Sequence, residues 1–504
     1  MNPCRTRAAR RPWLPTLILA FLLALIPLLA GGVAVEAQGP TPVVINEFMA
    51  SNSQTLADED GDFSDWIELY NRSSQPVSLA GVGLSDTSST PFRWVLPTID
   101  LAPGQHLLIW ASGKNRATPG SPLHTNFSIS AGGEPLLLTH PTAGQWDATA
   151  PLALAADISY GRQPDGADPW FYFARPTPGS SNSASPGYSE ILAPPAFSRQ
   201  GGFYTTAFDL TLSSTIPGAQ IIYTLDGSLP DPANLAGQTY SYKNSFPQNP
   251  GDPFGPLLSD SFRTQPYSGP LAIVDRSAAP DKLTQKSSTY DFAPTYFPQQ
   301  PVFKGTVVRA RVIKPGALPS PVSTHTYFVT PQGRARYSLP VVALSIPEDV
   351  LFDYDDGIYT AGVLFDGWRS ANPTAAASPA SDANWHRRGE EHEYPAHFEL
   401  IEPGSSTAAL SQGVGVRVHG NATRAFRMKS LRLYARSSYG ASSIAYPIFP
   451  DQSLDTYYRL ILRNSGNDFG YAMFRDAAIQ AIVAPLSFDT QAYRPAALFI
   501  NGEF

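Results

Sequence analysis

The sequence predicts a mainly β protein in which two tandem β-sandwich domains precede an α+β domain. Apolar segments with period-two alternation recur along the chain, as expected for half-buried strands. The 49 prolines and 39 glycines punctuate these segments with turns, which is typical of sandwiches and barrels. A helical period appears near the C-terminal end, where apolar residues between Phe474 and Ile482 recur on one helical face.

Two boundaries divide the chain into block one (41–178), block two (191–330) and block three (338–504). The clearer boundary is RPTPGSSNSASPGYSE, in which residues 179–190 form the expected linker. Its Pro, Gly and Ser content buries too little apolar surface to offset the entropy of ordering. The weaker boundary is PQGRARYS, where a strand-like segment ends. About three domains also suit a chain of this length.

The first 37 residues predict a secretory signal. A basic start precedes an apolar run over 13–30, and Val35 and Ala37 occupy the −3 and −1 positions of a cleavage site. A permanent anchor is the alternative, because the run is nearly long enough to span a bilayer. No second run approaches ~20 apolar residues, so we expect no membrane span after signal cleavage. The expected location is secreted, extracellular or at the cell surface.

Composition supports this location. Cys4 is the only cysteine and lies within the signal, so the mature chain has no disulfide or thiolate metal site. Removing the signal takes away four Arg and one Glu, which changes the net charge from −7 to −10. An acidic chain without a basic stripe binds nucleic acid poorly, so we expect no nucleic-acid partner.

Block one contains many short strands and no convincing helical period. Its characteristic segments are INEFMASNSQTLADEDGDFSDWIELYN, VSLAGVGLSD, LAPGQHLLIWASG and DISYGRQPDG. In combination they resemble a bacterial lamin-tail domain. The resemblance implies an immunoglobulin-like β-sandwich that binds or tethers an unknown protein or cell-envelope ligand and does not catalyse.

Two clusters of ligand-type side chains do not lead us to assign a metal site. The acidic run from Asp58 to Asp65 suggests calcium, because hard cations bind clustered carboxylate oxygens. The run lacks the glutamate that closes a calcium loop, so a solvated turn is favoured. His386, His392 and His397 are spaced by six and five residues, which places them on opposite faces of a strand.

Block two also alternates with period two. IIYTLDGSLP predicts a strand ending in a turn at Asp226 and Gly227, and TVVRARVIKPG places Val308, Ala310 and Val312 on one face. PAFSRQGGFY, IIYTLDGSLP, VRARV and SPVSTHTYF together resemble the chitobiase/β-hexosaminidase C-terminal type of β-sandwich. That resemblance implies an accessory module that spaces or supports a neighbouring domain. The long polar stretch 236–304 predicts a mobile insertion.

Block three changes from strands to a helix. In VGVRVHG, alternate valines share one face while Arg417 and His419 share the other. In KSLRLYAR, Leu431 and Leu433 face inward. The helical period near residue 474 follows these strands, with Asp468 as the expected cap.

Further segments of block three are specific in combination, namely LPVVALSIPEDVLFD, VRVHGNATRAFRMKSLRLYAR, RLILRNSGND, FRDAAIQAI and YRPAALFINGEF. They resemble the spore-coat CotH-type kinase family. The resemblance implies an atypical protein kinase that transfers a phosphoryl group from ATP with magnesium. In that family the catalytic and metal-binding acidic residues follow the INGE segment. We therefore expect an incomplete atypical-kinase-like domain, inactive alone, whereas a complete homologue uses ATP and Mg.

Three basic residues are candidates for contacts with nucleotide phosphates. The family resemblance favours Lys429 at the start of a strand, assisted by Arg424 and Arg427 in the preceding turn. The alternative is that all three are solvated turn charges. Arg475 and Asp476 begin the predicted helix and either position Lys429 or form a surface pair. No catalytic residue or metal ligand is assigned, and no GxxxxGK(S/T) run supports a P-loop mechanism.

Two functions remain open from the sequence. The first is an exported phosphoryl-transferring protein whose β modules hold a kinase-like domain at the cell surface. The second is a non-catalytic adhesion or scaffold protein. A carbohydrate-processing role rests on block two alone and needs a carboxylate pair in a cleft, which the sequence does not identify.

Overall fold

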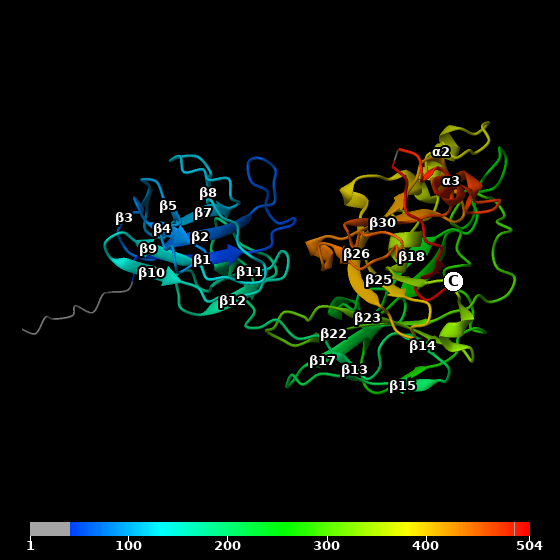
Figure 1. Cartoon of the computed structure of the whole chain (residues 1–504), viewed down its shortest axis with the longest axis horizontal. Coiled ribbons are helices and arrows are strands. Elements are labelled where there is room, and N and C mark those ends of the chain that lie inside the picture. The colour runs from blue at the N-terminus through cyan, green and yellow to red at the C-terminus, as the bar shows by residue number, and fades with distance from the viewer. Residues whose placement is uncertain (1–40, 488) are drawn as a thin grey trace, which may run out of the picture. The chain divides into compact units, whose positions relative to one another are not determined.

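The computed structural model describes residues 41–487 and 489–504, and strands dominate them (Figure 1). The predicted mainly β fold with a C-terminal α+β region is confirmed. The predicted secretory signal lies outside the described residues. Within the described range, no helix is long and apolar enough to cross a bilayer.

Block one has two main sheets. Their strand orders are β12-β11-β1-β2-β7-β8 and β10-β9-β4-β5, and β3 pairs with β6 separately. The strands are β1 (Val43–Met49), β2 (Asp65–Asn71), β3 (Val77–Ser78), β4 (Gly83–Ser85), β5 (Trp94–Val95), β6 (Asp100–Leu101), β7 (His106–Ala111), β8 (Leu123–His124), β9 (Leu137–His140), β10 (Gly144–Ala148), β11 (Ser159–Arg162) and β12 (Trp170–Phe173).

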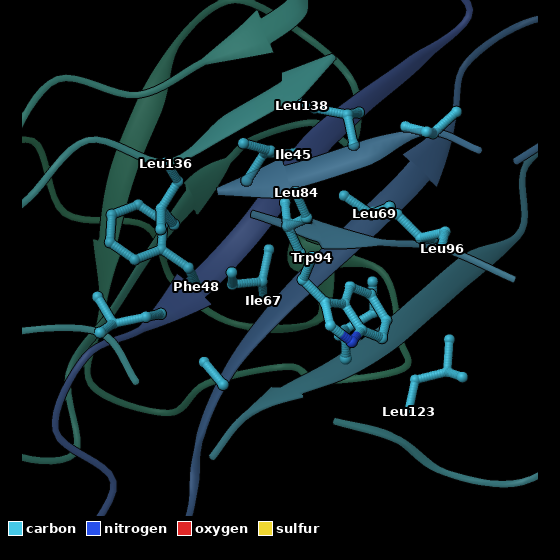
Figure 2. Close-up of a cluster of buried hydrophobic side chains, with 14 of the residues drawn as sticks. Ile45, Phe48, Ile67, Leu69, Leu84, Trp94, Leu96, Leu123, Leu136 and Leu138 are labelled. Carbon is cyan, nitrogen blue, oxygen red and sulfur yellow. The ribbon is translucent and has the colours of Figure 1, made fainter. Parts of the chain in front are cut away.

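The two sheets enclose the core of block one, which makes this block a β-sandwich (Figure 2). Ile45 and Ile67 come from the first sheet, and Leu84, Trp94 and Leu138 come from the second. All five side chains are buried. Burying one such aliphatic side chain contributes about 1.5–3 kcal/mol, so this core supplies much of the stability of the block.

The start of the expected linker is anchored to block one by buried carboxylates. Thr177 donates its backbone N–H and its hydroxyl to Glu47, the hydroxyl at 2.9 Å from Oε2. Gly179 donates its backbone N–H to Oε2 of Glu68 at 2.5 Å. Both glutamates are fully buried. These long-range bonds order the start of a segment that is rich in Pro, Gly and Ser.

Block two is built around a five-stranded sheet in the order β14-β23-β22-β17-β20. Val308, Ala310 and Val312 share one face as predicted, and this face lies in the core of the block. The strands are β13 (Ala196–Phe197), β14 (Gly202–Tyr204), β15 (Phe208–Leu210), β16 (Leu212–Ser213), β17 (Gln220–Thr224), β18 (Gln238–Tyr242), β19 (Leu258–Phe262), β20 (Gln265–Pro266), β21 (Leu271–Ile273), β22 (Thr306–Ile313) and β23 (Ser323–Val329).

The stretch 236–304 is packed, and the prediction of a mobile insertion is wrong. Strands β18 and β19 form an antiparallel hairpin within it. Tyr240 and Leu283 are buried in the core of block three, and Phe246 is buried against Phe365 and Trp385. These apolar residues are widely spaced in a polar sequence, so no local period reveals that they bury surface against another block.

Block three contains a six-stranded sheet in the order β30-β27-β26-β25-β24-β31. The strands are β24 (Val341–Ser345), β25 (Tyr394–Ile401), β26 (Leu410–His419), β27 (Ser430–Tyr434), β28 (Ile444–Ala445), β29 (Thr456–Tyr457), β30 (Arg459–Leu462) and β31 (Ala497–Ile500). The helices are α1 (Glu348–Phe352), α2 (Gly362–Ala371) and α3 (Arg475–Val483).

Helix α3 confirms the helical period, but its apolar residues are not buried. Phe474, which precedes the helix, is 56% exposed, and Ile482 is 75% exposed. The expected cap, Asp468, lies further back and accepts a hydrogen bond from the backbone N–H of Arg475 at 3.0 Å. The period therefore identified the element correctly without identifying what its apolar face contacts.

Blocks two and three share a core. Phe203 and Phe328 of block two pack with Val341 and Phe499 of block three. The ring centroids of Phe328 and Phe499 lie 4.7 Å apart. The boundary near residue 331 thus separates two stretches of sequence that form one packed body.

Candidate anion-binding site

A strongly basic cavity of about 240 Å³ lies in block three. It lies against strands β26 and β27 and the short 3-10 turn η6 (Ala422–Ala425). Two further arginines come from the segment after the 3-10 turn η4 (Asn384–His386). The polar side chains that line it are Arg387, Arg388, Arg417, His419, Arg424, Arg432 and Tyr434.

Strand alternation places these side chains on one face. Val416 and Leu431 point into the core of block three, as predicted. Arg417, His419 and Arg432 therefore point to the other face. Arg417 and Arg432 are direct cross-strand partners, and Nη2 of Arg432 lies 2.9 Å from Nδ1 of His419. Like charges placed opposite one another repel, so this face needs negative charge nearby.

The protein neutralises only part of this charge. Arg417 pairs with the buried Glu393, with Nε to Oε2 at 2.7 Å, and Arg387 pairs with the exposed Asp356 at 2.9 Å. Among the described residues, Arg388, Arg424 and Arg432 have no carboxylate ion-pair partner. Three positive charges at the cavity are therefore not neutralised by a carboxylate of the described chain.

The pKa values record the same repulsion. Burial, and after it the nearby charges of Arg388 and Arg432, lower the pKa of Arg424 to about 10. Burial also lowers the pKa of His419, which is surrounded by the same arginines and by Arg463. A bound anion would relieve this repulsion, so binding it is electrostatically favourable.

Arg424 is fixed at the cavity wall by backbone carbonyls. Its Nε donates to the carbonyl of Gly420 at 2.8 Å. Its Nη1 donates to the carbonyls of Trp385 at 2.7 Å and Arg387 at 3.1 Å. The residue is only 6% exposed. A guanidinium held in this way is preorganised, so little side-chain entropy is lost when an anion binds.

The side chain of Lys429 does not line the cavity. Its Nζ is surrounded by backbone carbonyls next to η6, the turn that carries Arg424. Its Nζ donates to the carbonyls of Ser288, Arg424 and Phe426 at 2.6, 2.5 and 3.0 Å. It also lies 4.2 Å from the ring centroid of Trp385. Burial lowers the pKa of Lys429 well below its usual value. The three N–H donors of the ammonium are thus engaged within the protein.

The other sequence-predicted residues also lie apart from the cavity. Arg427 is exposed, and its guanidinium lies 5.7 Å from the ring of Tyr296 and 5.5 Å from that of Phe469. Arg475 pairs with Asp468 at 3.1 Å. Asp476 pairs with Arg463 at the surface and not with Lys429. Of the three candidate phosphate contacts, only Arg424 lines the cavity.

The acidic run of block one surrounds a lysine. Nζ of Lys114 lies 2.7 Å from carboxylate oxygens of Asp58 and Asp60 and 2.9 Å from one of Asp62. Among the described residues, these three aspartates form the group whose carboxylate oxygens lie close enough together to hold a metal ion. The ammonium supplies the positive charge that a calcium ion would otherwise bring.

Three regions of the chain match protein-family models. A Lamin Tail Domain model matches residues 36–151, an Fn3 associated model matches 210–327 and a CotH kinase protein model matches 416–504. No curated protein matches the chain. The chain is therefore a multi-domain protein similar to these families in that order. The lamin-tail and CotH resemblances are confirmed, whereas the middle match does not confirm the chitobiase type.

Four residues that line the cavity lie within the CotH match over 416–504, namely Arg417, His419, Arg424 and Arg432. The CotH kinase family implies ATP and a metal in complete relatives. The arginines of the cavity suit the phosphate groups of ATP. For magnesium, no group of three ligand-type side chains lies in block three among the described residues.

Proposed function

We propose that block three binds the phosphate groups of ATP in the arginine cavity, as part of a CotH-type kinase-like domain. The observation that carries the proposal is the cluster of Arg388, Arg424 and Arg432 without carboxylate partners inside or beside the CotH match. Phosphoryl transfer depends on positive charge placed around the phosphates. Pockets for whole drug-sized ligands have volumes of about 300–1,000 Å³, so this smaller cavity suits the phosphates and not the base.

The lamin-tail and Fn3-associated modules complete the proposal as binding and spacer modules of an exported surface protein. The sandwich of block one supports a tethering role for an unknown protein or cell-envelope ligand. The packing of block two against block three supports an accessory role, because residues of the insertion complete the core of the kinase-like domain.

Export is expected to remove residues 1–37. The reason is the basic start, apolar run and small residues of the sequence. Protein recovered from the medium of a bacterial host should begin near Gln38 on N-terminal sequencing. Membrane-bound protein that keeps Met1 would show that the segment is an anchor.

Arg432→Gln is expected to weaken the binding of ATP and of pyrophosphate at least about tenfold. The variant removes a charge-assisted hydrogen bond to phosphate, which is typically about 1.5–3 kcal/mol. Isothermal titration of the purified chain, without added metal, measures both affinities. Arg263→Gln is the matched control, because Arg263 is exposed and lies in block two. An unaltered chain that binds neither ligand would overturn the proposal.

The alternative is an adhesion or scaffold protein that binds the anion without transferring phosphate. The position of Lys429 favours it, because backbone carbonyls already accept the hydrogen bonds of its ammonium. Incubation with ATP labelled on the γ-phosphate tests for phosphoryl transfer. Magnesium-dependent labelling of a protein acceptor supports the kinase function, and it would contradict the expectation that the domain is inactive alone.

A further inference from the structure

The packed insertion of block two contacts the loop that carries Arg424. Oγ1 of Thr289 donates to the carbonyl of Ala425 at 2.7 Å, and Oγ of Ser288 donates to the carbonyl of Arg427 at 2.5 Å. The carbonyl of Ser288 accepts from Nζ of Lys429. Ser288, Thr289 and Lys429 are all nearly completely buried. Two segments more than 130 positions apart in the chain are thus joined by three hydrogen bonds, of which those of Thr289 and Lys429 are buried and that of Ser288 Oγ is partly buried.

Lys429 also holds the loop that carries Arg424, through hydrogen bonds from its buried ammonium. Its ammonium draws together the carbonyls of Arg424 and Phe426 from the loop and of Ser288 from the insertion. Tyr359 adds a further tie, since its hydroxyl accepts the backbone N–H of Lys429 at 2.9 Å. The carbonyl of Arg424 therefore binds the ammonium of Lys429, while the guanidinium of Arg424 lines the cavity.

The insertion is itself anchored in the residues just before this contact. The carboxylate of Glu503 accepts the backbone N–H groups of Lys282, Leu283 and Thr284 at 2.6, 2.9 and 3.0 Å. Nζ of Lys286 pairs with Asp260 at 2.6 Å. A segment fixed in this way can hold a neighbouring loop in place, which a mobile insertion would not do.

We infer that Ser288, Thr289 and Lys429 are positioning residues for the anion site, so that the affinity of the block-three cavity depends on the insertion of block two. They hold the carbonyls of residues 424–427, and this fixes the direction in which Arg424 presents its guanidinium. The inference rests on the proposed function, because it concerns the same cavity. None of the three side chains lines that cavity.

Thr289→Val tests this inference because it keeps the shape of the side chain and removes its hydroxyl. Pyrophosphate affinity, measured by titration of the whole chain, is expected to fall about threefold to tenfold. Thr289→Ser keeps a hydroxyl at this position and is expected to keep the affinity of the unaltered chain. Thr239→Val, at an exposed threonine of the same insertion, is the control and is expected to change nothing.

Ionic strength separates positioning from direct contact. Arg432→Gln removes a charge at the cavity, so the affinity should depend less on salt. Thr289→Val removes no charge, so the salt dependence should match that of the unaltered chain. Affinity that falls with Arg432→Gln but not with Thr289→Val would overturn the inference and leave the proposed function standing. No pyrophosphate binding by the unaltered chain would overturn the proposed function itself.

Discussion

Replacing Asp281 with alanine is expected to lower the free energy of unfolding of blocks two and three by about 3–5 kcal/mol. The carboxylate of Asp281 pairs with Nζ of Lys304 at 2.5 Å, and both side chains are almost completely buried. The ammonium also donates to the carbonyl of Val302, which cannot neutralise it. Without Asp281, a full positive charge stays buried and uncompensated. The midpoint of urea unfolding, measured on the whole chain, reports the loss.

An exposed ion pair provides the control for Asp281→Ala. Lys314 and Glu190 lie 2.8 Å apart, and both are substantially exposed. Lys314→Met is therefore expected to cost at most about 1 kcal/mol. The double replacement Asp281→Leu with Lys304→Met removes both charges and is expected to recover much of the lost stability. Equal losses for the buried and exposed pairs would contradict the argument.

Block one is expected to lose stability as the pH rises from about 5 to about 8, by a few kcal/mol. Burial is the largest cause and raises the pKa of Glu68 from 4.5 to about 8, while hydrogen bonds from Asn46 and Gly179 oppose the rise. The folded block therefore keeps a proton that the unfolded chain releases. The resulting stability is fully present below the unfolded pKa and is lost as the pH rises through the folded pKa.

The urea transition of block one, followed at several pH values, measures this dependence. Glu68→Gln removes the titrating group and is expected to flatten the profile. A smaller slope should remain, because burial also raises the pKa of Asp65 to about 6. Asp168→Asn is the control, since that side chain is 97% exposed. A profile that is flat in the unaltered chain would show that Glu68 does not hold its proton.

Local patterns predicted the strands and their faces well. The alternation around Arg417 and His419 placed both on the face opposite the core, and the structure confirms this. The same reasoning did not bring them together in one cavity, because it treated each strand separately. The available signal was the arginine at an outward position on each of two consecutive strands, Arg417 and Arg432. Neighbouring strands bring such positions together.

The surroundings of Lys429 could not be predicted from local sequence. The family resemblance made Lys429, at the start of a strand, a candidate for a contact with phosphate. Only long-range contacts show where its ammonium lies. One of its acceptors, the carbonyl of Ser288, is 141 positions away in the chain. The insertion that supplies Ser288 was expected to be mobile, because its buried residues follow no local period. Both differences have one physical origin, since burial between distant segments leaves no periodic signal.

The parallel pairing of β24 with β31 has a consequence for how the chain folds. Val341 pairs with Ala497, so this contact closes a loop of 156 positions. The antiparallel contacts among β25, β26 and β27 join segments that are much closer in the sequence. Closing a long loop costs more entropy, and non-local pairing is slow to form. During synthesis, one edge of β24 therefore stays unpaired until β31 has been made. We expect the nascent protein to be most prone to misassembly during this time.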